Sequence, residues 1–133
     1  MHEADILVID DDPVVTRMLG RVLAGHPVTV THSGEAALEC LRNRTFALIL
    51  CDLTMPGMSG IVFYRAVKDI SEEMAKRVVF MTGGAFTPDA ERLVAVSTNR
   101  ILEKPFSPAE ALAAVRDTIA RLGPAAATGA DRT

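Results

Sequence analysis

The sequence contains no tryptophan, one tyrosine and two cysteines among 133 residues, and aromatic residues make up 5% of it. Proteins that bind single-stranded nucleic acids usually stack the bases on aromatic side chains, which are scarce here. The formal net charge of −3 at pH 7 also has the wrong sign for a duplex-binding domain, which carries a basic face. We therefore expect no nucleic-acid partner.

Long apolar stretches and cysteine motifs are missing as well. The longest apolar run, residues 46–51, is far shorter than the ~18 residues that a membrane-spanning helix needs. The acidic N-terminal residues differ from the basic start of a signal peptide. Cys40 and Cys51 are too few for a disulfide framework and lack metal-ligand spacing, so we interpret them as packed thiols. The sequence predicts a cytoplasmic protein with no membrane partner.

The composition that remains is sufficient for one folded domain. With 49% hydrophobic and 23% charged residues, the chain is close to the average of globular proteins. Its last residues, GPAAATGADRT, lose the apolar periodicity and are rich in glycine, proline and alanine. We expect a single domain over residues 1–122 and a flexible tail or linker stub over residues 123–133.

Short apolar runs alternate with longer amphipathic segments. The runs predict five strands, at 6–9, 28–30, 47–51, 78–81 and 100–102. Asp12, Thr87 and Ser107 each precede a proline, which is typical of a helix cap followed by the first helical position. The amphipathic segments predict five helices, at 13–24, 33–43, 60–73, 88–98 and 108–122. In the first helix the spacing predicts a buried face of Val14, Val15, Met18, Val22 and Leu23.

Five strand–helix pairs predict a doubly wound α/β fold of the flavodoxin-like kind, a parallel sheet in the order 2-1-3-4-5 flanked by five helices. In such sheets the functional crevice lies outside the carboxyl ends of the strands. Polar side chains follow four of the predicted strands: Asp10, Asp11 and Asp12, then Asp52, Thr82 and Lys104. We expect them to meet at one edge of the sheet.

Each of these residues alone has an ordinary explanation as a loop, turn or cap residue. Together they are less easily explained, because carboxylates ~4–5 Å apart repel by roughly 3–4 kcal/mol at an effective dielectric near 20. Asp10, Asp11 and Asp52 therefore need more positive charge than one lysine supplies. Mg²⁺ binds carboxylates, waters and phosphate oxygens. The pattern predicts a Mg²⁺ site, with Mn²⁺ as an alternative ion.

These residues resemble the receiver domain of bacterial two-component response regulators. The resemblance covers about residues 5–122 and rests on the acidic pair after the first strand, Asp52, Thr82 and the Lys104-Pro105 dipeptide. It implies a signalling switch in a phosphorelay rather than an enzyme with external substrates. Asp52 would accept a phosphoryl group from a histidine kinase or a phosphotransfer domain.

The resemblance also implies a role for the residues around Asp52. The implied Mg²⁺ ligands are Asp10, Asp11, Asp52 and the backbone carbonyl of Thr54, with Asp10 acting directly or through a water. The Thr82 hydroxyl and the Lys104 ammonium would contact the phosphoryl oxygens, and the peptide bond before Pro105 would be cis. The added charge would shift a two-state equilibrium and change a surface recognised by a downstream protein, or by the kinase core of the same parent chain.

Two features depart from the family pattern. Receivers commonly carry Phe, Tyr or His three residues before the lysine, where this sequence has Ile101. We hypothesise that switching relies instead on Thr82, Gly83 and Gly84; alternatively, Ile101 is only an outer-edge strand residue under the helix at 108–122. The Thr82-Gly83-Gly84 run is similar to that of receivers appended to hybrid histidine kinases.

Other functions remain as alternatives. A phosphohydrolase of the haloacid dehalogenase type would also use Asp52 as nucleophile, but such enzymes carry a second Asp two residues later, where this sequence has Thr54. A nucleotide- or flavin-binding module is poorer, because no glycine-rich phosphate loop follows the first strand. The helix at 108–122 is predicted mainly to pack on the core, with a weak homodimer as an alternative.

Overall fold

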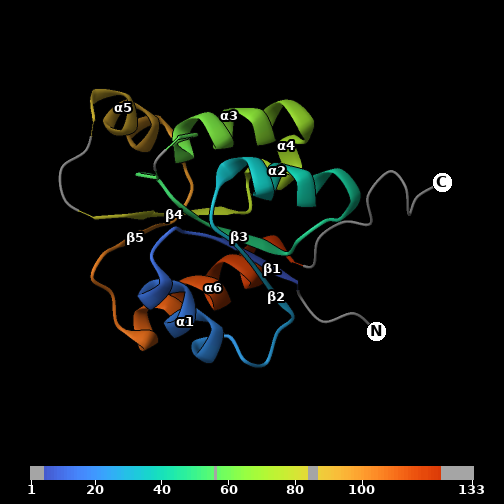
Figure 1. Cartoon of the computed structure of the whole chain (residues 1–133), viewed down its shortest axis with the longest axis vertical. Helices are drawn as coiled ribbons and strands as arrows, with labels where there is room; N and C mark the ends of the chain where they lie inside the picture. The colour runs from blue at the N-terminus through green and yellow to red at the C-terminus, as the bar shows by residue number, and fades with distance from the viewer. Residues whose placement is uncertain (1–4, 56, 84–86, 124–133) are drawn as a thin grey trace.

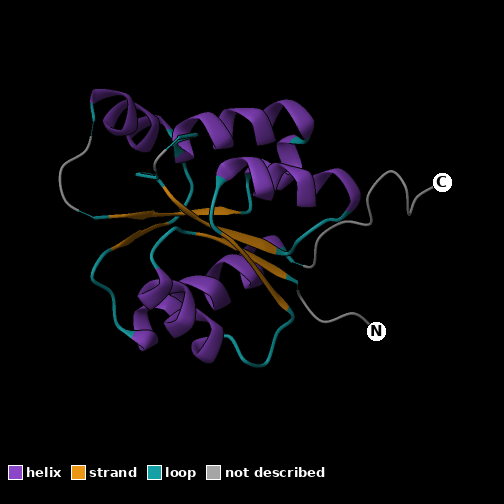
Figure 2. Ribbon diagram, in the orientation of Figure 1, coloured by secondary structure: helices purple, strands orange, loops and turns teal. Residues whose placement is uncertain are grey.

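The computed structural model describes residues 5–55, 57–83 and 87–123, which form a β-sheet between two layers of helices (Figure 1). Within these residues, five parallel strands have the predicted order β2-β1-β3-β4-β5. They are β1 (Ile6–Ile9), β2 (Val28–Thr31), β3 (Leu48–Asp52), β4 (Val78–Thr82) and β5 (Ile101–Glu103). Figure 2 shows the twisted sheet in the middle of the molecule. The predicted fold class is therefore confirmed.

Six helices cover the sheet in the described part of the chain: α1 (Pro13–Val22), α2 (Gly34–Asn43), α3 (Gly60–Ile70), α4 (Glu72–Ala75), α5 (Pro88–Val96) and α6 (Pro108–Leu122). The prediction of one helix over 60–73, and hence of five helices, is wrong. Ser71 adopts an extended conformation at the end of α3 and caps α4, because its hydroxyl accepts a hydrogen bond from the Met74 N–H at 3.0 Å.

The helix starts follow the caps predicted from the sequence. Asp12, Thr87 and Ser107 each accept a hydrogen bond from a backbone N–H in the first turn of the helix that follows. Ser107 and Glu110 form a reciprocal capping box. Because these caps begin α1, α5 and α6 soon after β1, β4 and β5, they limit the length of the loops at the carboxyl edge of the sheet.

The sheet separates two hydrophobic cores. In Figure 1, α1 and α6 lie below the sheet and α2, α3, α4 and α5 lie above it. Successive strand residues alternate between the two, as in β1, where Leu7 and Ile9 pack on the upper side and Ile6 and Val8 on the lower side. Both faces of β1, β3 and β4 are buried, as expected of central strands in a parallel sheet.

Two details of the predicted packing are wrong. Val14 is 67% exposed, and the fully buried side chains of this segment are Leu19 and Leu23. Ile101 is half-buried and packs with the core on the side of α5, so it does not lie under α6. Gly84 and residues 124–133 lie outside the described residues. In the part of the chain that the structure describes, no helix is both long and apolar enough to cross a membrane.

Candidate functional site

The carboxyl edge of the sheet brings Asp10, Asp52 and Lys104 into contact. Asp10 follows β1, Asp52 ends β3 and Lys104 follows β5. The Nζ atom of Lys104 lies 2.7 Å from Oδ2 of Asp10 and 3.3 Å from Oδ2 of Asp52. Asp10 is 0% and Asp52 is 2% exposed. One ammonium therefore faces two buried carboxylates, as the topology predicted.

Asp11 completes an acidic cluster. One carboxylate oxygen from each of Asp10, Asp11 and Asp52 lies within 4.8 Å of the other two. Asp11 is exposed, whereas the other two aspartates are buried. The cluster therefore has two buried carboxylates and one carboxylate that is accessible to a cation from solvent.

The charges in this cluster influence one another. Burial raises the pKa of Asp10, and the Asp52 carboxylate adds to this effect, although contacts with Lys104 and the Asp12 N–H oppose it. Burial alone lowers the pKa of Lys104, but the facing carboxylates of Asp10 and Asp52 outweigh it, and the net shift is upward. The carboxylates therefore stabilise the ammonium, while burying Asp10 in its charged form is unfavourable.

Thr54 holds the second oxygen of Asp52. Oδ1 of Asp52 accepts hydrogen bonds from the Thr54 N–H at 3.1 Å and from the Thr54 hydroxyl at 3.2 Å. Sequence reasoning used only the backbone carbonyl of Thr54 and missed both contacts. The side chain of an aspartate in a turn commonly accepts a hydrogen bond from the backbone N–H two residues later. A second turn of this kind follows β1, where Oδ1 of Asp10 accepts a hydrogen bond from the Asp12 N–H at 3.0 Å. These bonds fix the orientation of both buried carboxylates.

The start of α3 packs directly behind Asp52. A Cβ atom on Gly60 would lie 2.4 Å from the backbone oxygen of Asp52 and 2.7 Å from the Cα of Leu53. The Gly60 N–H also donates to the Leu53 carbonyl at 3.3 Å. Only glycine allows this approach between a helix start and a strand end, so Gly60 determines the path of the loop that carries Thr54.

The ends of β2 and β4 contribute further contacts to the residues of the site. Nδ1 of His32, which follows β2, lies 3.1 Å from the backbone oxygen of Asp10. Sequence reasoning missed His32, although it follows a strand that is adjacent to β1 in the predicted order. Thr82, at the end of β4, is buried, and its carbonyl accepts a hydrogen bond from the Lys104 N–H at 2.6 Å. The Lys104–Pro105 peptide bond is cis.

The remaining predicted switch residues have different positions. Gly83 follows β4 and its backbone lies against the side chain of Lys104. Ile101 begins β5, where it pairs in register with Phe80, and it packs in a core rather than in the acidic cluster. The structure therefore brings Gly83, but not Ile101, next to Lys104, the residue whose ammonium faces the acidic cluster.

The acidic cluster has the donor set of a hard divalent cation. Lys104 forms a 2.7 Å ion pair with Oδ2 of Asp10 and also faces Oδ2 of Asp52 at 3.3 Å, so this one ammonium is set against the three carboxylates of the cluster. The excess negative charge is unfavourable at these distances. Three carboxylates within 4.8 Å of one another offer ligands that Mg²⁺ or a similar ion accepts.

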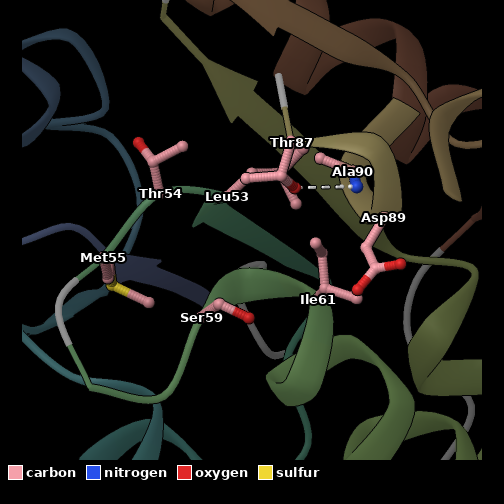
Figure 3. A pocket seen from close by; sticks show the side chains of 8 residues that line it. All are labelled: Leu53, Thr54, Met55, Ser59, Ile61, Thr87, Asp89 and Ala90. Carbon is pink, nitrogen blue, oxygen red and sulfur yellow. Dashed lines mark hydrogen bonds between the residues drawn. The ribbon is translucent and has the colours of Figure 1, made fainter. Parts of the chain in front are cut away.

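A pocket of about 620 Å³ lies beside the loop after β3 (Figure 3). Its walls are the loop after β3 and the first turns of α3 and α5, contributed by Leu53, Thr54, Met55, Ser59, Ile61, Thr87, Asp89 and Ala90. The hydrogen bond from the Ala90 N–H to the Thr87 hydroxyl, dashed in Figure 3, fixes the α5 wall. Thr54 both lines the pocket and contacts Asp52, whereas Asp10, Asp11, Asp52 and Lys104 are not among the lining residues.

Comparison with other sequences gives a consistent match. The model of the response regulator receiver domain matches residues 6–116. The DNA-binding response regulator MtrA of Mycolicibacterium smegmatis is 34% identical over 118 residues, which are 87% of this chain and 50% of that protein. The response regulator receiver protein CpdR of Brucella abortus is 35% identical over 106 residues, 76% of this chain and 84% of that protein. MtrA and other curated relatives are longer proteins, and this chain spans between 50% and 59% of their length.

Solved structures show the same fold. The Vibrio cholerae chemotaxis protein CheY4 superposes with a TM-score of 0.76 at 27% identity, over 87% of this chain and 98% of that one. The matched residues 6–116 run from β1 into α6 and include every residue of the acidic cluster. On both sequence and fold, this chain belongs to the family of response regulator receiver domains, which are signalling domains.

Proposed function

We propose that this chain is the phosphoacceptor switch of a two-component phosphorelay, and that Asp52 accepts the phosphoryl group. The observation that carries the proposal is the setting of Asp52 at the end of β3. Its side chain is buried, Lys104 Nζ lies 3.3 Å from one oxygen, and Thr54 donates two hydrogen bonds to the other. A carboxylate so oriented, facing an ammonium, suits attack on an anionic phosphoryl group.

In the proposed reaction an oxygen of Asp52 forms a bond to phosphorus while the N–P bond of a phosphohistidine breaks. The bonding electrons leave with the imidazole nitrogen, which is then protonated from solvent, and Asp52 becomes an acyl phosphate. Phosphoryl transfer depends mainly on positioning and on neutralising charge. Thr54 positions the carboxylate, and the flexible stem of Lys104 allows its ammonium to follow the phosphoryl oxygens. We assign the Thr82 hydroxyl to the same oxygens.

We assign Asp10, Asp11, Asp52 and the backbone carbonyl of Thr54 as ligands of Mg²⁺, with Mn²⁺ as an alternative. Such an ion supplies neutralisation of the charge on phosphoryl oxygens when it is bound. The contribution of the chain is to hold three carboxylates within 4.8 Å, two of them fixed by turns in their own loops. Their mutual repulsion favours the bound state over the empty one.

Phosphorylation adds a charge of about −1.5 to −2 and shifts a two-state equilibrium toward a form with a changed interaction surface. We propose that Thr82, Gly83 and Gly84 carry this change, because Ile101 offers no ring to reorient. The donor is a histidine kinase or a phosphotransfer domain, and the recipient is a downstream protein or the kinase core of the same parent chain, in the cytoplasm. MtrA is named as DNA-binding, but this chain matches half of it, and its net charge of −3 disfavours duplex binding.

Labelling with acetyl phosphate and Mg²⁺, followed by intact-mass measurement, tests the proposal. The wild-type protein should gain one phosphoryl group, and Asp52→Asn should gain none. Asp69→Asn is a matched control, because Asp69 is exposed in the last turn of α3, and it should be labelled like the wild type. Labelling of Asp52→Asn, or labelling of the wild type that continues in excess EDTA, would contradict the assignment.

A further inference from the structure

The Thr54 hydroxyl contacts the proposed phosphoacceptor directly. It donates a hydrogen bond to Oδ1 of Asp52 at 3.2 Å, and the Thr54 backbone N–H donates to the same oxygen at 3.1 Å. Asp52 is 2% exposed, whereas Thr54 is exposed in the loop after β3. Figure 3 shows the hydroxyl on the side of Thr54 that faces away from Ser59 and Ile61. The hydroxyl of an exposed residue is therefore turned toward a buried carboxylate.

The two oxygens of the Asp52 carboxylate have different partners. Oδ2 faces the Lys104 ammonium at 3.3 Å, and Oδ1 accepts both hydrogen bonds from Thr54. A carboxylate oxygen has two lone pairs, so the two donors of Thr54 occupy both lone pairs of Oδ1. A further partner at Oδ1 has to replace one of these donors.

A divalent cation should approach Asp52 through Oδ1 rather than Oδ2. The ammonium of Lys104 already lies at Oδ2, and two positive groups on one oxygen repel each other strongly. Oδ1 lies in the turn of Thr54, whose backbone carbonyl is another of the proposed Mg²⁺ ligands. The N–H on Oδ1 is held by the backbone of this turn, whereas the hydroxyl can rotate toward water because Thr54 is exposed. The hydroxyl is therefore the donor that a cation replaces.

We propose that Thr54 is a positioning residue whose hydroxyl competes with Mg²⁺ for Oδ1 of Asp52: it holds the carboxylate in the metal-free protein and releases it when the metal binds. The backbone N–H of Thr54 orients the carboxylate in both forms. The inference rests on the proposed function, because Asp52 is one of the proposed Mg²⁺ ligands. Since the hydroxyl stabilises only the metal-free form, its removal should destabilise that form and strengthen Mg²⁺ binding by the same factor.

Calorimetric titration with Mg²⁺ tests the competition on the unphosphorylated chain. Thr54→Val keeps the shape and the backbone N–H but removes the hydroxyl, and it should lower the dissociation constant roughly two- to tenfold, the usual contribution of one hydrogen bond. Thr54→Ser keeps the hydroxyl and should bind Mg²⁺ like the wild type. An unchanged dissociation constant in Thr54→Val would overturn the inference, and a raised one would show instead that the hydroxyl assists metal binding.

Urea denaturation in EDTA and in saturating Mg²⁺ measures the other half of the same equilibrium. In EDTA the midpoint of Thr54→Val should be lower than that of the wild type, and the change in the unfolding equilibrium constant should match the fold-change in the dissociation constant. In saturating Mg²⁺ the difference should disappear, because neither protein then has the hydrogen bond. A deficit of the same size in both conditions would mean that the bond survives metal binding, which contradicts the competition.

Thr98→Val is the matched control. Thr98 is exposed and precedes β5, at the opposite edge of the sheet, so this variant should bind Mg²⁺ like the wild type. Circular dichroism checks that each variant is folded, and Thr54→Ala, which also lacks the hydroxyl, decides the test if Thr54→Val is not.

Failure of this inference can be distinguished from failure of the proposed function. If the wild type binds no Mg²⁺ at millimolar concentration, the proposed metal site is wrong and the competition is wrong with it. If the wild type binds Mg²⁺ but Thr54→Val and Thr54→Ser have equal midpoints in EDTA, the proposed site stands and only the role of the hydroxyl is overturned.

Discussion

Nη1 of Arg77 donates a 2.8 Å hydrogen bond to the backbone carbonyl of Gly123, the residue that follows α6. The same nitrogen donates to the Ala47 carbonyl, next to β3, at 3.1 Å. The guanidinium also contacts Glu73 Oε2 through Nε and Nη2, and Arg77 is 1% exposed. Arg77 precedes β4, so this buried cation joins the sheet to the end of the last helix at the edge opposite the acidic cluster.

We expect Arg77→Met to lower the free energy of unfolding by about 1–3 kcal/mol, because methionine fills the space but leaves the carbonyls of Ala47 and Gly123 without this donor. Urea denaturation measures the change. Arg42→Met is the control, since the ion pair of Arg42 with Glu39 is 70% exposed on both sides and should matter by less than about 0.5 kcal/mol. Equal denaturation midpoints for Arg77→Met and the wild type would show that these bonds contribute nothing.

Much of the fold could be predicted because it depends on local patterns. The apolar runs place each strand within one residue, and the caps at Asp12, Thr87 and Ser107 begin their helices where the structure has them. The break at Ser71 could not be predicted, because the residues around it are compatible with a helix. It depends on whether the serine hydroxyl reaches the Met74 N–H in the folded chain.

The site was predictable only to the level of which residues share an edge. Parallel strands bring Asp10, Asp52 and Lys104 together whatever their side chains do, so topology alone predicts their proximity. Topology does not determine which carboxylate the ammonium approaches more closely, because that depends on side-chain torsions and on the space beside Gly83. The exposure of Val14 was missed because the spacing of apolar residues in α1 is compatible with more than one buried face. The packing of the helix on the sheet determines which face is buried.

The two cysteines should differ in reactivity. Cys51 is fully buried, and burial raises the pKa of its thiol, with the carboxylates of Asp52 and Asp10 adding to the shift. Its thiolate fraction at neutral pH is therefore very small. Cys40 is half-buried on α2. We expect one thiol per folded chain to react with a disulfide reagent, and the second to react only after denaturation.

Cys40→Ser provides the control for that experiment. The folded variant should show almost no reaction, whereas Cys51→Ser should react like the wild type before denaturant is added. Rapid modification of folded Cys40→Ser would mean that β3 opens to solvent far more often than a fully buried central strand should.

Without a metal ion, the acidic cluster should lower the free energy of unfolding, and the Asp10→Asn variant measures this effect. Folding raises the pKa of Asp10 above its ordinary value of 3.8, chiefly through burial. The folded protein therefore holds this proton more tightly than the unfolded chain does. The stability contributed by the group is lost as the pH rises through the raised pKa, and at neutral pH the ionised Asp10 is unfavourable.

An asparagine at position 10 has about the same size and no charge to desolvate. It gives up the ion pair with Lys104, but Lys104 keeps its contact with Asp52 at 3.3 Å. We expect Asp10→Asn to raise the free energy of unfolding in EDTA by about 1 kcal/mol, the usual size of a single-residue effect, because burial outweighs the contact with Lys104 in setting the pKa of Asp10. Asp69→Asn should leave stability unchanged.

Repeating the denaturation in millimolar Mg²⁺ turns this result into a test of the cluster. An ion that binds only the folded state stabilises it by RT ln(1 + [Mg²⁺]/Kd). The wild type should therefore gain more from Mg²⁺ than Asp10→Asn, which has lost one carboxylate of the cluster. The difference in the free energy of unfolding between Asp10→Asn and the wild type should therefore become smaller, or change sign, when the metal is added. A variant that is less stable than the wild type in EDTA would show instead that the Asp10–Lys104 ion pair outweighs the burial and repulsion of the carboxylate.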